Sequence, residues 1–217
     1  MAYPTISAPY GLKPVNLIGG QVFAGATRLL NIASGYNTSI FYGDAVKLVS
    51  TGTIQKDTGT TTATPVGVFL GCSYVNSQGQ TIFTQYFPAN TTAPTGTTIT
   101  AYVADDPDQL FKVALVSGTT ADGDGLTVAF LGRTIIGGNV EIVQNTGSTV
   151  TGDSKIGVYS AAGATTTATL PLRVIDVVPD TANSSGNFCE VIVKWNAPNV
   201  TGQTVAGGHQ YLNPTGV

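Results

Sequence analysis

The sequence predicts a mainly β protein, made of two related β-sandwich or barrel-like modules with extended N- and C-terminal arms and very little helix. Its apolar runs are short, rich in β-branched and aromatic residues, and bounded by Gly, Pro, Asn or Asp, which is typical of strands. Only 10% of the 217 residues are charged, so uncharged polar residues must supply most of the water-facing surface. A series of short landmarks also occurs twice along the chain, which indicates an internal duplication.

We expect four segments in chain order. Residues 1–33 form an extended arm and a first strand, because several prolines near the start disfavour packed elements. Residues 34–145 form the first β-module with inserted strands, and residues 146–205 form the second module. Residues 206–217 form a C-terminal tail that ends in turn-forming residues. Either arm could reach a neighbouring molecule.

The expected strands are separated by turn signals. In the last of them, period-two pleating places Val191, Val193 and Trp195 on one face, which should be buried. The charged Glu190 and Lys194 fall on the other face, so this strand should be half buried. The five clearest strands are Ala45–Val49, Val66–Val75, Thr81–Phe87, Leu110–Val116 and Phe188–Trp195.

The duplication rests on landmarks that recur in the same order. Each copy begins with a Gly-Asp turn and a short strand ending in Ser, continues through a Thr-rich turn and a Pro into a second apolar strand, and then reaches an Asn-Ser-x-Gly hairpin signal. A Thr-rich composition alone could also produce such a repeated pattern. Two copies are too few for a solenoid, so we expect a pseudo-symmetric pair of sheets. The matched stretches are 43–50 with 152–160, 60–65 with 165–171, and 76–90 with 183–199.

The charge pattern argues against a direct nucleic-acid partner and against a membrane. The formal net charge is −3 and the pI is near 4.8, so the scattered Lys and Arg residues form no basic surface. No apolar run approaches the roughly 20 residues that cross a bilayer, and the first residues carry no secretory signal. We therefore expect assembly in the cytoplasm, where Cys72 and Cys189 should be small buried residues rather than a disulfide.

Signatures of catalysis and of metal or cofactor binding are weak. Nucleophilic catalysis generally needs a base beside the nucleophile, and the only histidine is His209 in the tail. Zinc needs several Cys and His ligands at close spacing, which this chain does not offer. Residues 122–125 are similar to the start of a calcium loop, but the loop spacing places Arg133 where a bidentate Glu is required. We expect no catalytic residues, no metal and no cofactor.

The alternative from another class is a sugar-binding module or a hydrolase that uses the acidic cluster Asp105, Asp106 and Asp108. Both functions need a pair of carboxylates. Adjacent residues of a strand point to opposite faces, so Asp105 and Asp106 are poorly placed to converge. A single helical turn starting at Pro107, with an acidic cap before it, explains the cluster as a structural feature.

Five stretches that together span almost the whole chain carry a resemblance to a known class of proteins. They are similar to small head decoration proteins, also called cement proteins, of tailed bacteriophages. The resemblance implies a virion protein that binds the outer surface of the capsid. The stretches are APYGLKPVNLIGG at 8–20, YGDAVKLVS at 42–50, TPVGVFLGCSY at 64–74, AYVADDPDQLFKV at 101–113 and HQYLNPTGV at 209–217.

The resemblance also implies partners. These are the lattice of the major capsid protein, at joints between capsomers, and other copies of the chain. Decoration proteins form trimers, dimers and monomers, and we expect a trimer rather than a dimer. We expect the arms to make the contacts, through Tyr10, Leu12, Pro14, His209 and Tyr211. A phage tail tube subunit remains an alternative, because it is also a β-rich oligomer, whereas the heptads or Gly-x-y repeats of a fibre are absent.

Overall fold

The computed structural model describes residues 9–116, 132–159, 166–181, 188–198 and 207–213. It confirms the mainly β fold: helix in this part of the chain occurs only as short 3₁₀ turns. The strands are β1 (Lys13–Leu17), β2 (Arg28–Ile32), β3 (Ala45–Leu48), β4 (Ile54–Lys56), β5 (Gly67–Val75), β6 (Thr81–Thr84), β7 (Ile99–Ala104), β8 (Gln109–Val116), β9 (Asn139–Val143), β10 (Gly157–Tyr159), β11 (Leu172–Val177) and β12 (Glu190–Trp195). The 3₁₀ helices are η1 (Gly132–Ile135), η2 (Pro179–Thr181) and η4 (Gln210–Leu212).

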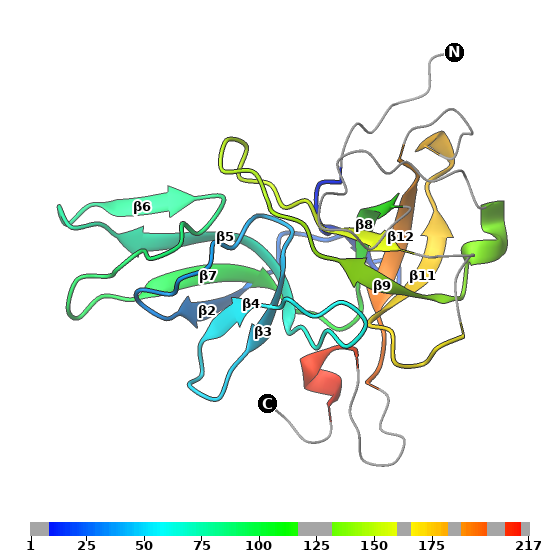
Figure 1. The fold of residues 1–217 in the computed structure, drawn as a ribbon, viewed down its shortest axis with the longest axis horizontal. Coiled ribbons are helices and arrows are strands. Elements are labelled where there is room, and N and C mark those ends of the chain that lie inside the picture. Colours follow the sequence, from blue (N-terminus) through cyan, green and yellow to red (C-terminus); the bar gives the residue numbers. More distant parts are fainter. Residues whose placement is uncertain (1–8, 117–131, 160–165, 182–187, 199–206, 214–217) are drawn as a thin grey trace.

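The first sheet has the order β3-β4-β2-β7-β5-β6 and is closed by a further pairing of β3 with β5. Five strands therefore form a barrel-like ring, and β6 extends β5 outside it (Figure 1). Alternate side chains of these strands point into the ring and form its apolar core. That core includes Ile32, Phe69, Phe87, Ile99 and Val103, each at most 3% exposed.

The second sheet has the order β1-β8-β10-β9-β11-β12 and is closed by a pairing of β8 with β12. It too contains a ring of five strands, with β1 added along the N-terminal part of β8. Its core is centred on Phe111 and Trp195, whose rings meet edge to face with centroids 5.4 Å apart. Ala45 and Val68 of the first ring belong to the same apolar cluster. The two barrels, side by side in Figure 1, therefore share a packed interface.

The boundary between the barrels differs from the expected module boundary. The first sheet uses strands between residues 28 and 104, whereas β8 and β9, expected as inserted strands of a module ending at residue 145, belong to the second sheet. The reason is the apolar run of β8, which pairs over five residues with β12, far along the chain. β1 also joins the second sheet, so the second sheet contains strands that precede and strands that follow the first sheet in the sequence.

The structure does not confirm the internal duplication. Both expected copies contain an antiparallel hairpin near the matched position, β5–β6 in the first and β11–β12 in the second. The preceding strands differ, because β3 pairs directly with β5 while β9 lies between β10 and β11. The two Gly-Asp turns nevertheless lie side by side: the Tyr42 N–H donates to Gly152 O, and the Ser154 N–H donates to Tyr42 O.

Local strand patterns agree well with the structure. Val191, Val193 and Trp195 are buried on one face of β12, and Cys72 and Cys189 are buried free thiols. The expected helical turn at Pro107 does not form. Instead, a β-turn joins β7 to β8, closed by a hydrogen bond from the Gln109 N–H to Asp106 O, because the two flanking strands are paired into the sheets on either side.

The described parts of the two arms are integrated into the fold rather than projecting from it. Residues 13–17 form β1, which is paired with β8. The tail residues His209–Leu212 contain η4, which packs where the two barrels meet (Figure 1). Its backbone reaches both barrels, because the Gln210 N–H donates to Pro65 O and the His209 N–H donates to Asn196 O. Within the described residues, no helix is long and apolar enough to cross a membrane.

Candidate functional site

The five expected contact residues lie in different environments. Leu12 and His209 are fully buried within their own chain, and Tyr10 and Pro14 are half buried. Only Tyr211, at 43% exposed, presents a substantial surface. Leu12 and His209 therefore fill the protein's own core and are not available to a neighbouring molecule in this fold. The physical reason is that each apolar or aromatic side chain finds an internal cluster to pack against.

Tyr10 is tied to the second barrel by its hydroxyl. The hydroxyl donates to Glu190, which is 3% exposed and also pairs with Lys112 at 3.1 Å. Burial raises the pKa of Tyr10, and the hydrogen bond to Glu190 raises it further. Glu190 lies on the β12 face expected to meet water, and its burial is explained by these two partners.

His209 and Tyr211 anchor the tail beside the acidic cluster. The Tyr211 N–H donates to His209 Nδ1 at 3.2 Å, and the two rings lie 5.2 Å apart. Burial lowers the pKa of His209 from 6.5 to about 4. The Tyr211 hydroxyl donates to Asp105 Oδ2 at 2.9 Å, while Arg28 also binds this carboxylate. Burial, followed by the contact with Asp105, raises the pKa of Tyr211 to about 12.

Each of the three carboxylates of the acidic cluster has its own structural partners. Asp105 binds Arg28 and Tyr211, as described above. Asp106 Oδ1 accepts the Asp108 N–H at 2.8 Å within the turn, and Asp108 pairs with Lys194 of β12. A hollow of about 520 Å³ adjoins Asp105 and Asp106. Within the described residues, no group of three or more His, Cys, Asp or Glu side chains is arranged to hold a metal ion.

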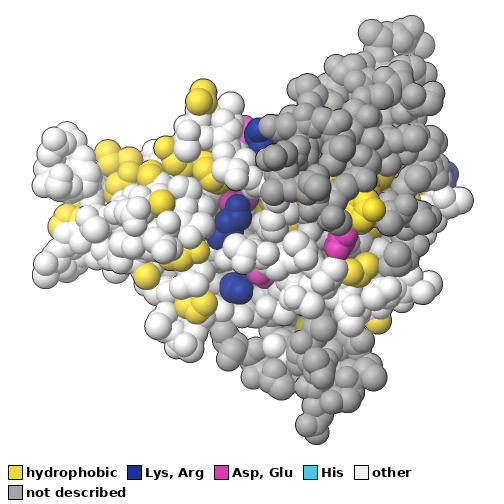
Figure 2. Space-filling model, in the orientation of Figure 1, with side chains coloured by type: hydrophobic (Ala, Val, Ile, Leu, Met, Phe, Trp, Pro, Cys, Tyr) yellow, Lys and Arg dark blue, Asp and Glu magenta, His cyan; other side chains and the backbone are white. Residues whose placement is uncertain are grey.

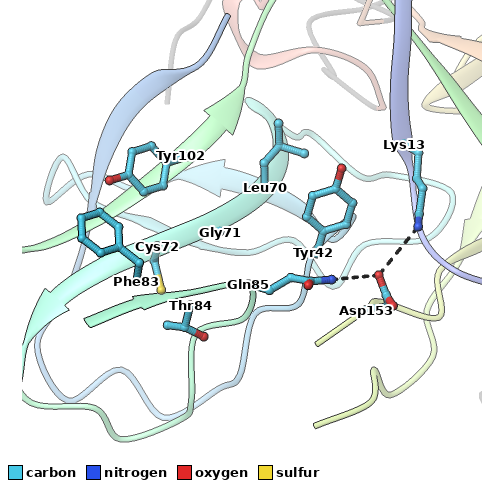
Figure 3. A pocket seen from close by; sticks show the side chains of 10 residues that line it. All are labelled: Lys13, Tyr42, Leu70, Gly71, Cys72, Phe83, Thr84, Gln85, Tyr102 and Asp153. Atoms are coloured by element: carbon cyan, nitrogen blue, oxygen red, sulfur yellow. Dashed lines mark hydrogen bonds and ion pairs between the residues drawn. The ribbon is translucent and has the colours of Figure 1, made fainter. Parts of the chain in front are cut away.

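An aromatic groove lies on the outside of the first barrel, with a volume of about 560 Å³ (Figure 3). Phe83 of β6 and Tyr102 of β7 lie at one end of it, and Leu70 and Tyr42 lie along it. Phe83 is 72% exposed. Hydrophobic side chains are spread over the first barrel in Figure 2, whereas most visible charges lie near the middle of the molecule. The visible face of the first barrel therefore carries scattered hydrophobic side chains and few charges.

Strand alternation and one glycine shape the groove. On β7, Ala101 and Val103 point into the core, so Tyr102 between them points outward. β5 has an irregular register at Gly71, which has a φ of +139°. A Cβ at this position would lie 3.1 Å from the backbone oxygen of Thr84, and the positive φ is unfavourable for other residues, so glycine suits this point of the groove wall.

A polar rim connects the groove to the second barrel. Asp153, in the loop before β10, accepts from Gln85 Nε2 at 3.1 Å and pairs with Lys13 of β1 at 3.7 Å. The Lys13 ammonium also lies 5.5 Å from the centre of the Tyr42 ring, close enough for a cation–π contact. Figure 3 shows these polar side chains at the end of the groove opposite Phe83. The groove is therefore built by both barrels.

The one reactive residue type beside the groove is not activated. Cys72 is 1% exposed, and burial raises its pKa to about 12. The thiolate is the nucleophilic form of cysteine, so this side chain stays a neutral, apolar part of the wall at physiological pH. The groove can bind another surface by apolar and aromatic contact, and its Cys72 thiol is not an activated nucleophile.

Sequence reasoning did not identify the groove. Phe83 and Tyr102 are distant in the sequence. They line the same groove because β5 lies between β6 and β7 in the sheet. The available signal was the alternation around Tyr102, in which small buried residues flank an aromatic one. Comparison with known protein families, with characterised proteins and with solved structures found no significant match.

Proposed function

We propose that this chain is a structural virion protein that binds the outer surface of a phage capsid and cements neighbouring capsomers, without catalysis. The observation that carries the proposal is the open aromatic groove of Tyr42, Leu70, Phe83 and Tyr102, which is supported by both barrels. Tyrosine and phenylalanine are enriched in the contact surfaces of proteins, because they bury a large area at a small cost in side-chain entropy.

The surroundings of the groove also favour a lattice contact. The exposed apolar residues Phe83 and Leu29, 72% and 62% exposed, lie on the outward faces of strands in the same sheet. Few charges would have to be desolvated when such a surface is covered, so close contact with another protein carries a small desolvation penalty. The resemblance of five stretches of the sequence to phage decoration proteins supports the capsid as the partner.

The test is binding of the purified protein to emptied heads of the phage that carries its gene. We expect co-sedimentation with the heads and regular density on the outer lattice in cryo-electron microscopy. Tyr102→Ser, which removes an aromatic wall of the groove, should raise the dissociation constant about tenfold or more. The matched control is Val150→Ser, at a loop residue that is 93% exposed and lies outside the groove. Equal binding by both variants would exclude the groove as the contact.

The same sample separates the two rival functions. Stacked rings in the absence of any binding to heads would favour a tail tube subunit. The sugar-binding or hydrolase alternative is tested by replacing Asp105, Asp106 and Asp108 with Asn. Such an enzyme would lose its activity, whereas a cement protein should keep its binding to heads and lose only some stability through Arg28 and Lys194.

A further inference from the structure

β6 is an edge strand with one side uncovered. The order of the first sheet ends at β6, which pairs only with β5. In Figure 1 the β5–β6 hairpin lies at the end of the first barrel away from the second barrel, with β6 outermost. The backbone groups on the outer side of an edge strand are a template for pairing with another strand.

The register identifies the groups that face outward. The Asn76 N–H donates to Gln80 O at 2.9 Å, so these two residues form a hydrogen-bonded pair beside the hairpin turn. Hydrogen-bonded and non-hydrogen-bonded pairs alternate along an antiparallel ladder. Ile82 and Thr84 therefore bond to β5, whereas the N–H and C=O groups of Thr81 and Phe83 point away from it. The described part of the chain provides no backbone partner for them on that side.

β6 is short, but it lacks two features that commonly prevent edge pairing. Its four residues, Thr81–Thr84, include no charge and no proline. Phe83 is 72% exposed in the middle of this short strand. A bare, uncharged edge with an exposed aromatic residue is suited to adding a strand from another chain.

We propose that β6 pairs in antiparallel orientation with β6 of a second copy of this chain, about a two-fold axis at Phe83. The second copy fits because Phe83 offers both a donor and an acceptor outward, so two Phe83 residues can exchange two backbone hydrogen bonds. Their side chains then lie opposite each other on one face, where cross-strand aromatic pairs are favourable. Identical copies do not repel at this edge, because the strand carries no charge.

The pairing has a structural consequence for the groove. Phe83 lines the groove, so a two-fold contact at Phe83 places the grooves of two copies next to each other on one continuous sheet. The product is a closed dimer, because the same patch is used by both copies. It differs from the trimer expected in the sequence analysis. The inference does not depend on the proposed capsid function.

The first experiment is sedimentation equilibrium of the full chain over a range of concentrations, without heads. We expect a reversible monomer–dimer equilibrium that Phe83→Lys weakens tenfold or more, because two lysines then oppose each other at the axis. Val150→Lys adds the same charge at a highly exposed loop residue and should leave the equilibrium unchanged. A chain that stays monomeric up to about 0.1 mM, or a dimer that is indifferent to Phe83→Lys, overturns the proposal.

A second variant covers the case in which the lysine prevents folding. Across a hydrogen-bonded antiparallel pair the Cα atoms lie about 5.5 Å apart, within the range that a disulfide spans. Phe83→Cys should therefore form a covalent dimer under mild oxidation, while Leu29→Cys, on the same sheet but away from β6, should stay monomeric. The native Cys72 and Cys189 are buried and do not interfere. Equal cross-linking of the two variants, or none, contradicts pairing at Phe83.

Discussion

The hydroxyl of Ser154 donates a 2.5 Å hydrogen bond to Asp44 Oδ1 and so joins the two barrels across 110 residues of sequence. Both residues are fully buried. Asp44 also accepts the Phe41 N–H at 2.9 Å and pairs with the Lys56 ammonium at 3.0 Å. A buried carboxylate is tolerated only when it is paired and hydrogen bonded, so these contacts form one unit at the interface of the barrels.

Ser154→Ala should lower the free energy of unfolding by about 1–3 kcal/mol, because it removes a donor from a buried charge. Asp44→Asn should cost more, about 3–5 kcal/mol, because it leaves Lys56 largely buried without its counterion. Urea unfolding followed by circular dichroism measures both values. Ser148→Ala, which removes a longer hydroxyl contact in a partly exposed turn, is the control and should change stability little. Similar losses of unfolding free energy in all three variants would contradict the inference that the contacts of Asp44 stabilise the interface of the barrels.

Two glycines with the same backbone conformation predict different mutational costs. Gly11 has a φ of +83° and Gly20 a φ of +82°, but a Cβ at Gly11 would lie 2.7 Å from the Ser154 Cβ, whereas a Cβ at Gly20 meets nothing within 4 Å. Gly20→Ala should therefore cost only the backbone strain, about 1 kcal/mol. Gly11→Ala should cost about 1–3 kcal/mol more, because it also forces overlap at the barrel interface. Thermal unfolding of the two variants checks this difference, and equal melting temperatures would refute it.

Local patterns in the sequence were sufficient to predict most of the strands. The alternation that buries Val191, Val193 and Trp195 is a property of one strand, and it is read directly from neighbouring residues. The fully buried Cys189 follows from the same run. These features depend on no contact between distant parts of the chain, which is why they agree with the structure.

The features that the sequence did not predict depend on pairing between distant parts of the chain. Glu190 is charged and was expected to face water, but Tyr10 and Lys112, both distant in sequence, make its burial possible. The assignment of β8 to the second barrel depends in the same way on β12. The groove requires Phe83 of one barrel and Asp153 of the other to line the same surface, and no local pattern in the sequence indicates that relationship.

Gln210 predicts a local effect of the tail on the first barrel. Its side-chain amide makes two hydrogen bonds to the backbone of Leu48, as a neighbouring strand would. Oε1 accepts the Leu48 N–H at 2.8 Å, and Nε2 donates to Leu48 O at 2.9 Å. Gln210→Ala should therefore increase the hydrogen-exchange rate of the Leu48 amide, while most other amides of β3 and β4 keep their protection. Gln78→Ala, in the exposed turn after β5, is the control. Unchanged protection at Leu48 would show that the tail does not hold this edge in solution.

We expect His209 to make the protein less stable in mild acid. It is the only histidine of the chain, and burial lowers its pKa from 6.5 to about 4. Between these values the unfolded chain binds a proton that the folded chain does not. Stability is therefore fully present above pH 6.5 and falls as the pH drops toward 4, by up to roughly 3 kcal/mol.

Replacing the imidazole by a ring that does not titrate isolates this effect. Urea unfolding at pH 7.5, 6 and 5 should show a decline in the wild-type protein that is much smaller in His209→Phe, even if the variant is less stable at pH 7.5. The carboxylates also titrate near the lower end of this range, but they are the same in both proteins. Parallel declines would mean that His209 is protonated as readily in the folded chain as in the unfolded one, which the buried position between Trp195 and Tyr211 argues against.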